Sequence, residues 1–168
     1  MTTRVGIIFG SESDKEIMRE AADVLDQVGV EWEARVISAH RSPELAKEYA
    51  STAKDRGIEV IIAGAGLSAH LPGVMAAWTT LPVIGVPIKA GALAGFDALL
   101  SISQMPPGVP VAAVGINAAR NAAILACEIL ALKDADIAAR LAEMRKAQTE
   151  RLERLKAVDV LKGHSPER

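Results

Sequence analysis

The chain has 168 residues, of which 50% are hydrophobic and only 3% aromatic, so Ala, Ile, Leu and Val must supply most of a core large enough for one domain. A formal net charge of −2 excludes the strongly basic surface typical of proteins that bind nucleic acid or an anionic membrane. No apolar run approaches the roughly 20 residues that cross a bilayer, and because the chain leads straight into a strand-like run we expect no signal peptide. One cysteine, Cys127, cannot form an internal disulfide, so we expect a cytoplasmic protein without nucleic-acid or membrane partners.

Five short apolar runs alternate with helical patterns along the chain. The predicted strands are Val5–Phe9, Trp32–Ile37, Val60–Ala63, Val83–Val86 and Val111–Ile116, and the predicted helices cover residues 14–28, 43–56, 71–78, 96–103 and 118–132. The connections are too long for hairpins, which favours parallel strands joined by right-handed crossovers. We therefore predict an α/β fold with a three-layer, doubly wound parallel sheet of five strands, flavodoxin-like or Rossmann-like, in the order 2-1-3-4-5.

The C-terminal part has a different pattern from the rest. From Asp134 to about Lys156 a narrow apolar stripe runs among charged residues and predicts a long helix. The stripe consists of Ile137, Leu141, Met144, Leu152 and Leu155. We expect a single domain overall, in which residues 1–133 form the α/β catalytic unit and residues 134–162 a helix packed on it or on a neighbouring subunit, with a frayed end at 163–168. In the Ala-rich helix before this tail, Cys127 is expected to be a small buried hydrophobe.

The turn after the first strand, Gly10–Asp14, carries two hydroxyls and a carboxylate at the start of a helix. Backbone N–H groups and the helix dipole favour an anion such as phosphate there. Because the Asp14 carboxylate would repel phosphate, it is better suited to accept hydrogen bonds from sugar hydroxyls. Simple helix capping is the alternative for Ser11, Ser13 and Asp14, since Ser13 and Glu16 have the spacing of a capping box.

The turn after the second strand combines Ser38, His40 and Arg41. Ser42 is predicted to be the N-cap of the next helix and Pro43 its first residue. The planar guanidinium of Arg41 suits a phosphate group, and the imidazole of His40 suits general acid–base chemistry near neutral pH. A surface charge and a structural histidine are the simpler alternatives, but the carboxyl ends of parallel strands are where such folds bind ligands.

The turn after the third strand, Gly64–His70, contains two glycines that would let the backbone approach a small planar ligand. It is not a dinucleotide fingerprint, because Ala69 stands where the third glycine belongs. His70 suits either the site or the cap of the following helix. Since His40, His70 and His164 lack the spacing of metal ligands, no metal is expected. The residues alone predict a site for a small phosphorylated ligand beside a histidine able to transfer protons.

The three turns together resemble those of the class I carboxyaminoimidazole ribonucleotide mutases of purine biosynthesis. The resemblance extends over Val5 to Thr149, in order and at the expected spacings. It rests on Gly10–Asp14, Ser38–Pro43, Gly64–Gly66, Ala69–Gly73, Ser103–Pro106 and Asn121–Leu125.

This resemblance implies an isomerase that converts N(5)-carboxyaminoimidazole ribonucleotide to the 4-carboxy isomer, without metal or organic cofactor. Decarboxylation, trapping of carbon dioxide and recarboxylation would use His40 as acid and base. Ser11, Asp14 and Arg41 would bind the ribose phosphate with help from Ser13 and Ser38. Gly64, Ala65, Gly66 and His70 would close over the base and carbon dioxide. The resemblance also implies a homo-octamer with sites at subunit contacts.

Two alternatives remain open at this point. The first is a direct carboxylase that adds carbon dioxide to aminoimidazole ribonucleotide. That sister branch typically lacks the segment Ala69–Gly73, which is present here and favours the mutase. The second is a non-catalytic nucleotide-binding protein on the same fold, because a fold does not determine a function.

Overall fold

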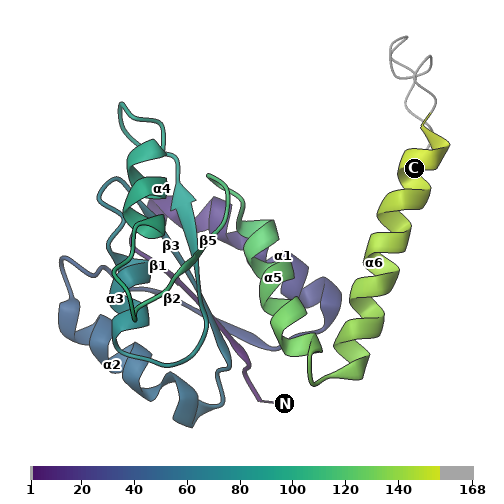
Figure 1. Ribbon diagram of the computed structural model, residues 1–168, viewed down its shortest axis with the longest axis horizontal. Helices are drawn as coiled ribbons and strands as arrows, with labels where there is room; N and C mark the ends of the chain where they lie inside the picture. The colour runs from purple at the N-terminus through teal and green to yellow at the C-terminus, as the bar shows by residue number, and fades with distance from the viewer. Residues whose placement is uncertain (1, 156–168) are drawn as a thin grey trace.

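The computed structural model describes residues 2–155. Its centre is a sheet of five parallel strands in the order β2-β1-β3-β4-β5 (Figure 1), which confirms the predicted fold class and strand order. The strands are β1 (Val5–Phe9), β2 (Trp32–Val36), β3 (Val60–Gly66), β4 (Val83–Ile88) and β5 (Ala112–Ala113). The predicted continuation of the tail over 156–162, its frayed end and His164 lie outside the described residues.

Helices cover both faces of this sheet. They are α1 (Lys15–Val28), α2 (Pro43–Ala53), α3 (Leu71–Ala77), α4 (Phe96–Ser103), α5 (Ala119–Ala131) and α6 (Ala135–Arg154), with the 3-10 turns η1 (Glu12–Asp14) and η2 (Lys54–Arg56). Buried residues of α1 and α5 pack on one face and those of α2, α3 and α4 on the other. The result is three layers, and α6 lies outside α5 (Figure 1).

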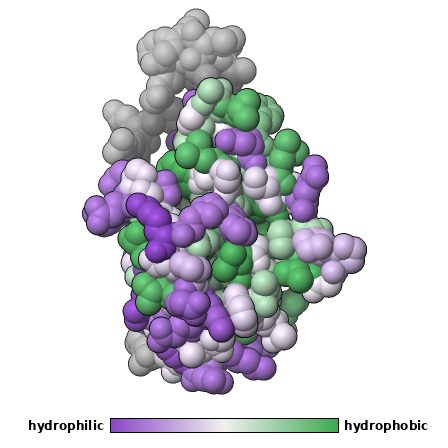
Figure 2. Space-filling view, turned by 90° about the vertical axis from the view of Figure 1, so that its left-hand side faces the viewer, coloured by the Kyte–Doolittle hydropathy of each residue, from purple (hydrophilic) through white to green (hydrophobic). Residues whose placement is uncertain are grey.

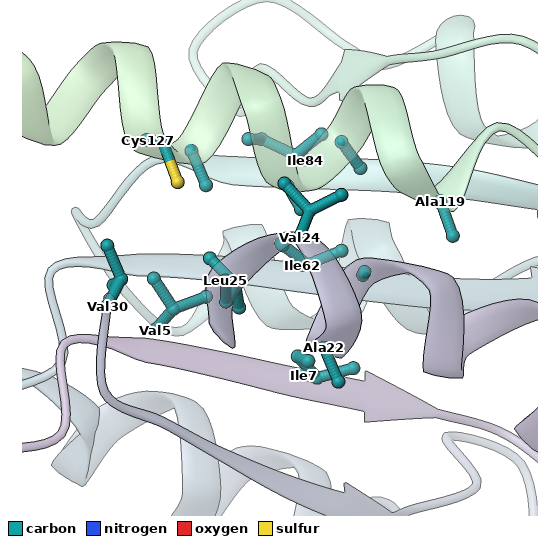
Figure 3. Close-up of a cluster of buried hydrophobic side chains, with 14 of the residues drawn as sticks. Val5, Ile7, Ala22, Val24, Leu25, Val30, Ile62, Ile84, Ala119 and Cys127 are labelled. Carbon is teal, nitrogen blue, oxygen red and sulfur yellow. The ribbon is translucent and has the colours of Figure 1, made fainter. Parts of the chain in front are cut away.

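Aliphatic side chains fill the space between the sheet, α1 and α5 (Figure 3). Leu25 and Val24 of α1 are fully buried and pack with Ile62 of β3 in this cluster. Cys127 of α5 belongs to the same cluster and is fully buried, which confirms its predicted role as a small hydrophobe. The core therefore uses small and branched residues, as the low aromatic content predicts.

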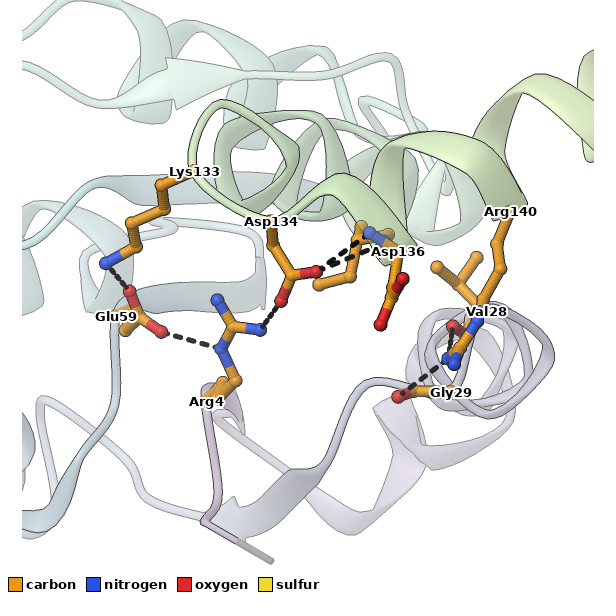
Figure 4. Close-up of polar contacts among 9 residues, drawn as sticks. Arg4, Val28, Gly29, Glu59, Lys133, Asp134, Asp136 and Arg140 are labelled. Carbon is orange, nitrogen blue, oxygen red and sulfur yellow. Dashed lines mark hydrogen bonds and ion pairs between the residues drawn. The ribbon is translucent and has the colours of Figure 1, made fainter.

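The start of α6 is fixed to the domain by polar contacts (Figure 4). Asp134 caps the helix, because its Oδ1 accepts bonds of 3.2 Å from the backbone N–H groups of residues 136 and 137. Its other oxygen accepts a 2.6 Å bond from Arg4, which also bonds to Glu59 at 2.6 Å. One turn further on, Arg140 donates a 2.8 Å bond to the carbonyl oxygen of Val28 at the end of α1. These contacts hold the first turns of α6 against the domain.

Hydrophobic side chains are also exposed near α4. Leu93, Phe96 and Leu100 are 61%, 65% and 55% exposed. Figure 2 shows hydrophobic residues gathered toward the top of the molecule, the end at which α4 lies in Figure 1, above a mainly hydrophilic lower part. Within residues 2–155, no helix is long and apolar enough to cross a membrane.

Several predicted boundaries are wrong by a few residues. The third strand does not end at Ala63 but continues through Gly66, because residues 64–66 still pair with Val86, Pro87 and Ile88 of β4. The fifth strand is only two residues long, since the chain leaves β4 after Val114. The helix after Pro43 ends at Ala53 and tightens into η2 before Gly57, and the short third helix ends at Ala77, one residue early.

The predicted caps also need correction. The capping box at Ser13 does not form; Ser11 is the cap, and its hydroxyl accepts a bond from the Ser13 N–H at the start of η1. Ser42 occupies the N-cap position of α2, but its side chain makes no capping bond. Its carbonyl accepts the first helical bond from Ala46 instead. In both cases the sequence predicts where the helix starts more accurately than it predicts which group bonds to the free backbone N–H groups of the first turn.

Candidate active site

The turns that follow β1, β2 and β3 open on the same edge of the sheet, as predicted. They surround a cavity of about 440 Å³. Its lining residues are Gly10, Ser11, Ser13, Asp14, Ser38, Ala39, His40, Arg41, Ala65, Gly66, Leu67, Ser68, His70, Leu71 and Ala90. Backbone bonds connect the turns, because Gly10 N–H donates to the Gly64 carbonyl at 3.3 Å and Ile37 N–H donates to the Phe9 carbonyl at 2.9 Å.

The first turn places a buried carboxylate beside two hydroxyls. Ser13 Oγ lies 2.9 Å from Ser11 Oγ and 3.2 Å from Asp14 Oδ1. Asp14 is only 9% exposed, and this burial raises the pKa of its carboxyl, while the hydrogen bonds to Ser13 and Ser11 counteract part of the increase. An acceptor held in this way at the cavity wall suits the hydroxyl groups of a sugar.

The second turn is organised around Arg41. Ser38 Oγ accepts bonds from the Arg41 backbone N–H at 3.2 Å and from its Nε at 3.3 Å. Arg41 Nη2 donates a 3.0 Å bond to the carbonyl oxygen of Gly10. The guanidinium therefore links the first turn to the second while its charge stays at the mouth of the cavity. A bound phosphate would find a cation whose direction is already set.

Two imidazoles meet at the wall of the cavity. His40 Nε2 and His70 Nδ1 are 3.1 Å apart, and the ring centroids are 5.0 Å apart at a tilt of 45°. One nitrogen of this pair must carry a proton and the other must accept it. His70 holds the N-cap position of α3 but makes no capping bond, so the structure places it in the site rather than on the helix.

The pair lines a second cavity as well as the main one. The second cavity, again about 440 Å³, shares His40, Ser68 and His70 with the first. The rest of its lining is mainly apolar and includes Val74 and Met105. A group bound at the imidazoles could therefore contact either space.

Of the two glycines at the end of β3, Gly64 has a different role from the one predicted. Gly64 and Gly66 belong to the strand rather than to a ligand-binding loop, and Gly64 does not line the cavity. A Cβ at Gly64 would lie 2.4 Å from Met18 Sδ, so this glycine lets α1 pack closely on the sheet. Ala65 and Gly66 do reach the cavity, as predicted.

Sequence reasoning missed a few lining residues. Leu67 and Ser68 line the cavity directly after β3, and Leu67 has a left-handed backbone with φ of 54°. Ala90 comes from the loop after β4, the next strand in the sheet. The strand order alone could have indicated Ala90, because its strand ends at the same edge.

The fold and the cavity define an α/β protein with a cavity at the carboxyl ends of its strands, lined by a guanidinium, a buried carboxylate and an imidazole pair. Within the described residues, no group of three His, Cys, Asp or Glu side chains is arranged to hold a metal ion. The family model described as AIR carboxylase matches residues 4–151. The chain therefore belongs to the AIR carboxylase family.

Curated relatives in this family have a more specific name. The chain is 62% identical over 143 residues to the N5-carboxyaminoimidazole ribonucleotide mutase of Pyrococcus abyssi, covering 85% of this chain and 82% of the relative. It is 52% identical over 159 residues to the protein of the same name from Thermotoga maritima, covering 92% and 93% of the two chains.

Solved structures agree with the fold. The crystal structure of Treponema denticola PurE superposes with a TM-score of 0.77 at 31% identity and covers 88% of this chain and 92% of that one. The structure titled Treponema denticola PurE2-S38D gives a TM-score of 0.79 at 30% identity, with coverages of 90% and 94%. These similarities extend over nearly all of both chains, and they confirm the resemblance drawn from the three turns.

Proposed function

We propose that the protein converts N5-carboxyaminoimidazole ribonucleotide to 4-carboxyaminoimidazole ribonucleotide in purine biosynthesis. The observation that carries the proposal is the convergence of Asp14, His40 and Arg41 on one cavity, in a chain 62% identical to a protein named as this mutase. The reaction is an isomerisation: a carboxyl group leaves the exocyclic nitrogen and joins a ring carbon of the same molecule.

The lining residues suit the parts of such a ribonucleotide. Arg41 would pair with the phosphate, and the hydroxyls of Ser11, Ser13 and Ser38 would support it. Asp14 would accept hydrogen bonds from the ribose. Ala65, Gly66 and His70 would enclose the base, whereas Gly64 would act only through the packing of β3. Binding in this way fixes the aminoimidazole beside the imidazole of His40, and such fixed proximity is a large part of catalysis.

The proposed mechanism has two steps and one proton transfer. The bond between the exocyclic nitrogen and the carboxyl carbon breaks, releasing carbon dioxide inside the site. The ring carbon then attacks this carbon dioxide and loses its proton, and the exocyclic nitrogen gains one. His40 would carry that proton, because an imidazole both accepts and donates protons near neutral pH. Retention of carbon dioxide requires that bulk water be excluded during the reaction.

We further propose that the protein works in the cytoplasm as a homo-octamer, with the unit of residues 1–133 carrying the site and the helix of residues 134–162 packing on it or on a neighbour. The exposed side chains of Leu93, Phe96 and Leu100 support an assembly, because exposed apolar clusters of this kind mark interaction surfaces. No nucleic-acid partner is expected from a net charge of −2.

A paired assay tests the reaction. One sample contains N5-carboxyaminoimidazole ribonucleotide without bicarbonate, and the other contains aminoimidazole ribonucleotide with bicarbonate; NMR follows the ribonucleotide carbons in both. Enzymatic conversion in the first sample, faster than spontaneous decay, is the expected result. Efficient carboxylation in the second sample alone would make the protein the direct carboxylase that the family description also allows. Turnover in neither sample would leave a nucleotide-binding protein.

The variant His40→Asn tests the proton carrier. Asparagine keeps a polar side chain of similar size but does not titrate. We expect turnover to fall by roughly 10²- to 10⁴-fold, the usual contribution of general acid–base catalysis, while the ribonucleotide still binds, as measured by calorimetry. Unchanged turnover would remove His40 from the proposed mechanism.

A further inference from the structure

The loop that follows β4 contributes to one wall of the cavity. This β4–α4 loop, residues 89–95, connects the fourth strand to the fourth helix. Its residue Ala90 lines the cavity together with Gly66 and Leu67 from the end of β3. In the proposed function Gly66 lies on the side that encloses the base of the ribonucleotide. The position of the loop therefore determines the space in which the base is held.

The loop packs closely along these two residues of the β3 end. A Cβ added at Gly66 would lie 3.2 Å from Ala90 Cβ and 3.1 Å from the carbonyl oxygen of Ile88. A Cβ added at Gly91 would lie 2.8 Å from Leu67 Cδ2. Because the two segments are in direct contact, a displaced loop would no longer support the wall that Gly66 and Leu67 form.

The conformation of the β4–α4 loop is not one that its own residues favour. Gly91, Ala94 and Gly95 have positive φ angles of 60°, 51° and 94°. Glycine adopts such angles freely, but for Ala94 the left-handed region is unfavourable. The bond from the Ala94 N–H to the Gly91 carbonyl inside the loop is long, at 3.4 Å. Contacts from outside the loop must therefore hold it in place.

Ile116 and Asn117, in the turn after β5, supply such contacts at both ends of the loop. At its start, the Lys89 N–H donates a 2.8 Å bond to Asn117 Oδ1, and the Asn117 N–H donates a 2.8 Å bond to the Pro87 carbonyl. At its end, a Cβ added at Gly95 would lie 2.8 Å from Ile116 Cγ2 and 3.2 Å from Lys89 Cα. The two ends of the loop thus lie side by side, and the turn after β5 holds them there.

Asn117 is not one of the residues that line the cavity. Its φ of 58° is left-handed, a conformation that asparagine adopts more readily than most residues. We propose that Asn117 is a positioning residue: by holding the β4–α4 loop, it fixes the wall formed by Gly66, Leu67 and Ala90 against the base of the bound ribonucleotide. This inference rests on the proposed function, which assigns the base to that side of the cavity.

The phosphate side of the cavity is held separately from this wall. Arg41 bonds to Ser38 and to the carbonyl oxygen of Gly10, on the turns after β2 and β1. Loss of the Asn117 amide should therefore weaken the binding of the base and leave the binding of the phosphate unchanged. When the loop keeps its position in only a fraction of the molecules, the apparent affinity falls by that fraction.

Two substitutions at this position separate the side chain from the backbone. Asn117→Gly keeps the left-handed backbone, because glycine adopts positive φ freely, and removes only the amide that accepts the Lys89 N–H. Asn117→Asp keeps an oxygen in the same place and also tolerates this backbone. The matched control is Thr79→Ala, which removes a hydroxyl that accepts a 3.2 Å bond from the Leu81 N–H before β4, at the opposite end of the same strand.

The measurement compares a ligand that has the base with one that lacks it. Titration calorimetry gives the affinity for aminoimidazole ribonucleotide directly and that for ribose 5-phosphate by competition. We expect Asn117→Gly to bind the ribonucleotide about 3- to 10-fold more weakly, which corresponds to the loss of one hydrogen bond, and to bind ribose 5-phosphate with unchanged affinity. Asn117→Asp should restore the affinity for the ribonucleotide, and Thr79→Ala should change neither value.

A second variant displaces the loop from its other side. In Gly91→Ala the new Cβ would meet Leu67 Cδ2, so we expect the same selective loss of affinity for the ribonucleotide. An equal loss for both ligands in Asn117→Gly would indicate a general structural role and overturn the proposal, as would an unchanged affinity for the ribonucleotide. Wild-type protein that does not bind the ribonucleotide at all would overturn the proposed function, and this inference with it.

Discussion

Arg41 links two of the turns that form the candidate site. It joins two turns through Ser38 and the Gly10 carbonyl, and it supplies the cation at the cavity mouth. For Arg41→Ala we expect affinity for the ribonucleotide to fall about 10- to 150-fold, because a hydrogen bond to a charged group contributes about 1.5–3 kcal/mol. Titration calorimetry measures the change. Arg41→Lys keeps the charge without the planar fork and should bind with intermediate affinity; wild-type affinity in Arg41→Ala would rule out the phosphate role.

Gly64 gives a second prediction at the scale of single residues. The close approach of Met18 Sδ, 2.4 Å from a hypothetical Cβ, leaves no room for a side chain. We expect Gly64→Ala to lower the free energy of unfolding by about 1–3 kcal/mol, the usual cost of overpacking a core, as measured by urea denaturation. Gly10→Ala is the control, because nothing lies within 4 Å of a Cβ there. Equal stability of the two variants would mean that α1 shifts easily.

The residues that line the cavity were easier to predict than the contacts that hold them in position. His40 and Arg41 could be identified from the sequence, because a polar turn after a buried strand indicates a ligand site in this fold. The contact between His40 and His70 could not, since it joins residues 30 apart through the relative placement of two turns. The role of Gly64 is not predictable in this way, because a sequence does not reveal which helix a glycine faces.

Among the secondary-structure elements, the two edge strands differed most in predictability. Trp32–Val36 alternates clearly and was predicted to within one residue. The run from Val111 to Ile116 is equally apolar, but only Ala112 and Ala113 pair with β4. A short apolar run indicates a buried strand. The number of backbone hydrogen bonds that this strand makes with its neighbour depends, however, on the path of the loop that follows it. Here Asn117, with φ of 58°, donates its N–H to the Pro87 carbonyl and takes the chain away from the ladder.

The ion-pair cluster that joins α6 to the sheet predicts a pH effect. Burial alone would raise the pKa of Glu59, but the bonds from Lys133 and Arg4 outweigh it and lower that pKa; the bond from Arg4 also lowers the pKa of Asp134. Carboxyls whose pKa is lower in the folded state stabilise it above their unfolded pKa values, roughly 4.3 for Glu and 3.9 for Asp. This stabilisation is lost as the pH falls through the lower folded values.

We therefore expect the melting temperature to fall on acidification below about pH 4.5, and Arg4→Gln to weaken that dependence because Asp134 loses its cation and Glu59 keeps only Lys133. Thermal melts between neutral pH and pH 3 measure the effect. Glu150→Gln is the control, since its pair with Arg154 is an exposed contact within one helix and such pairs contribute little. A pH dependence unchanged by Arg4→Gln would show that other carboxyls control acid unfolding.

At the scale of the whole molecule, the parallel sheet carries one hydrophobic cluster on each face, and Cys127 lies in the cluster on the side of α1 and α5, where it reports on opening of that layer. The thiol lies between α5 and α1 with no exposed surface, and burial raises its pKa to about 11. At pH 8 the thiol is therefore inaccessible to a reagent, and only a small fraction of it is in the reactive thiolate form, so its reaction with a thiol reagent is slow. Because the chain has a single cysteine, we expect negligible labelling by a thiol reagent in buffer and one label per chain in denaturant. Labelling in buffer should then proceed only at the rate at which the core unfolds.

Leu132→Cys, at an 87% exposed position, should add one rapidly reacting thiol and shows that the reagent is active. Rapid labelling of Cys127 in the native protein would instead mean that α5 separates from α1 without global unfolding, and the helix that supports α6 would then be the least stable part of this layer.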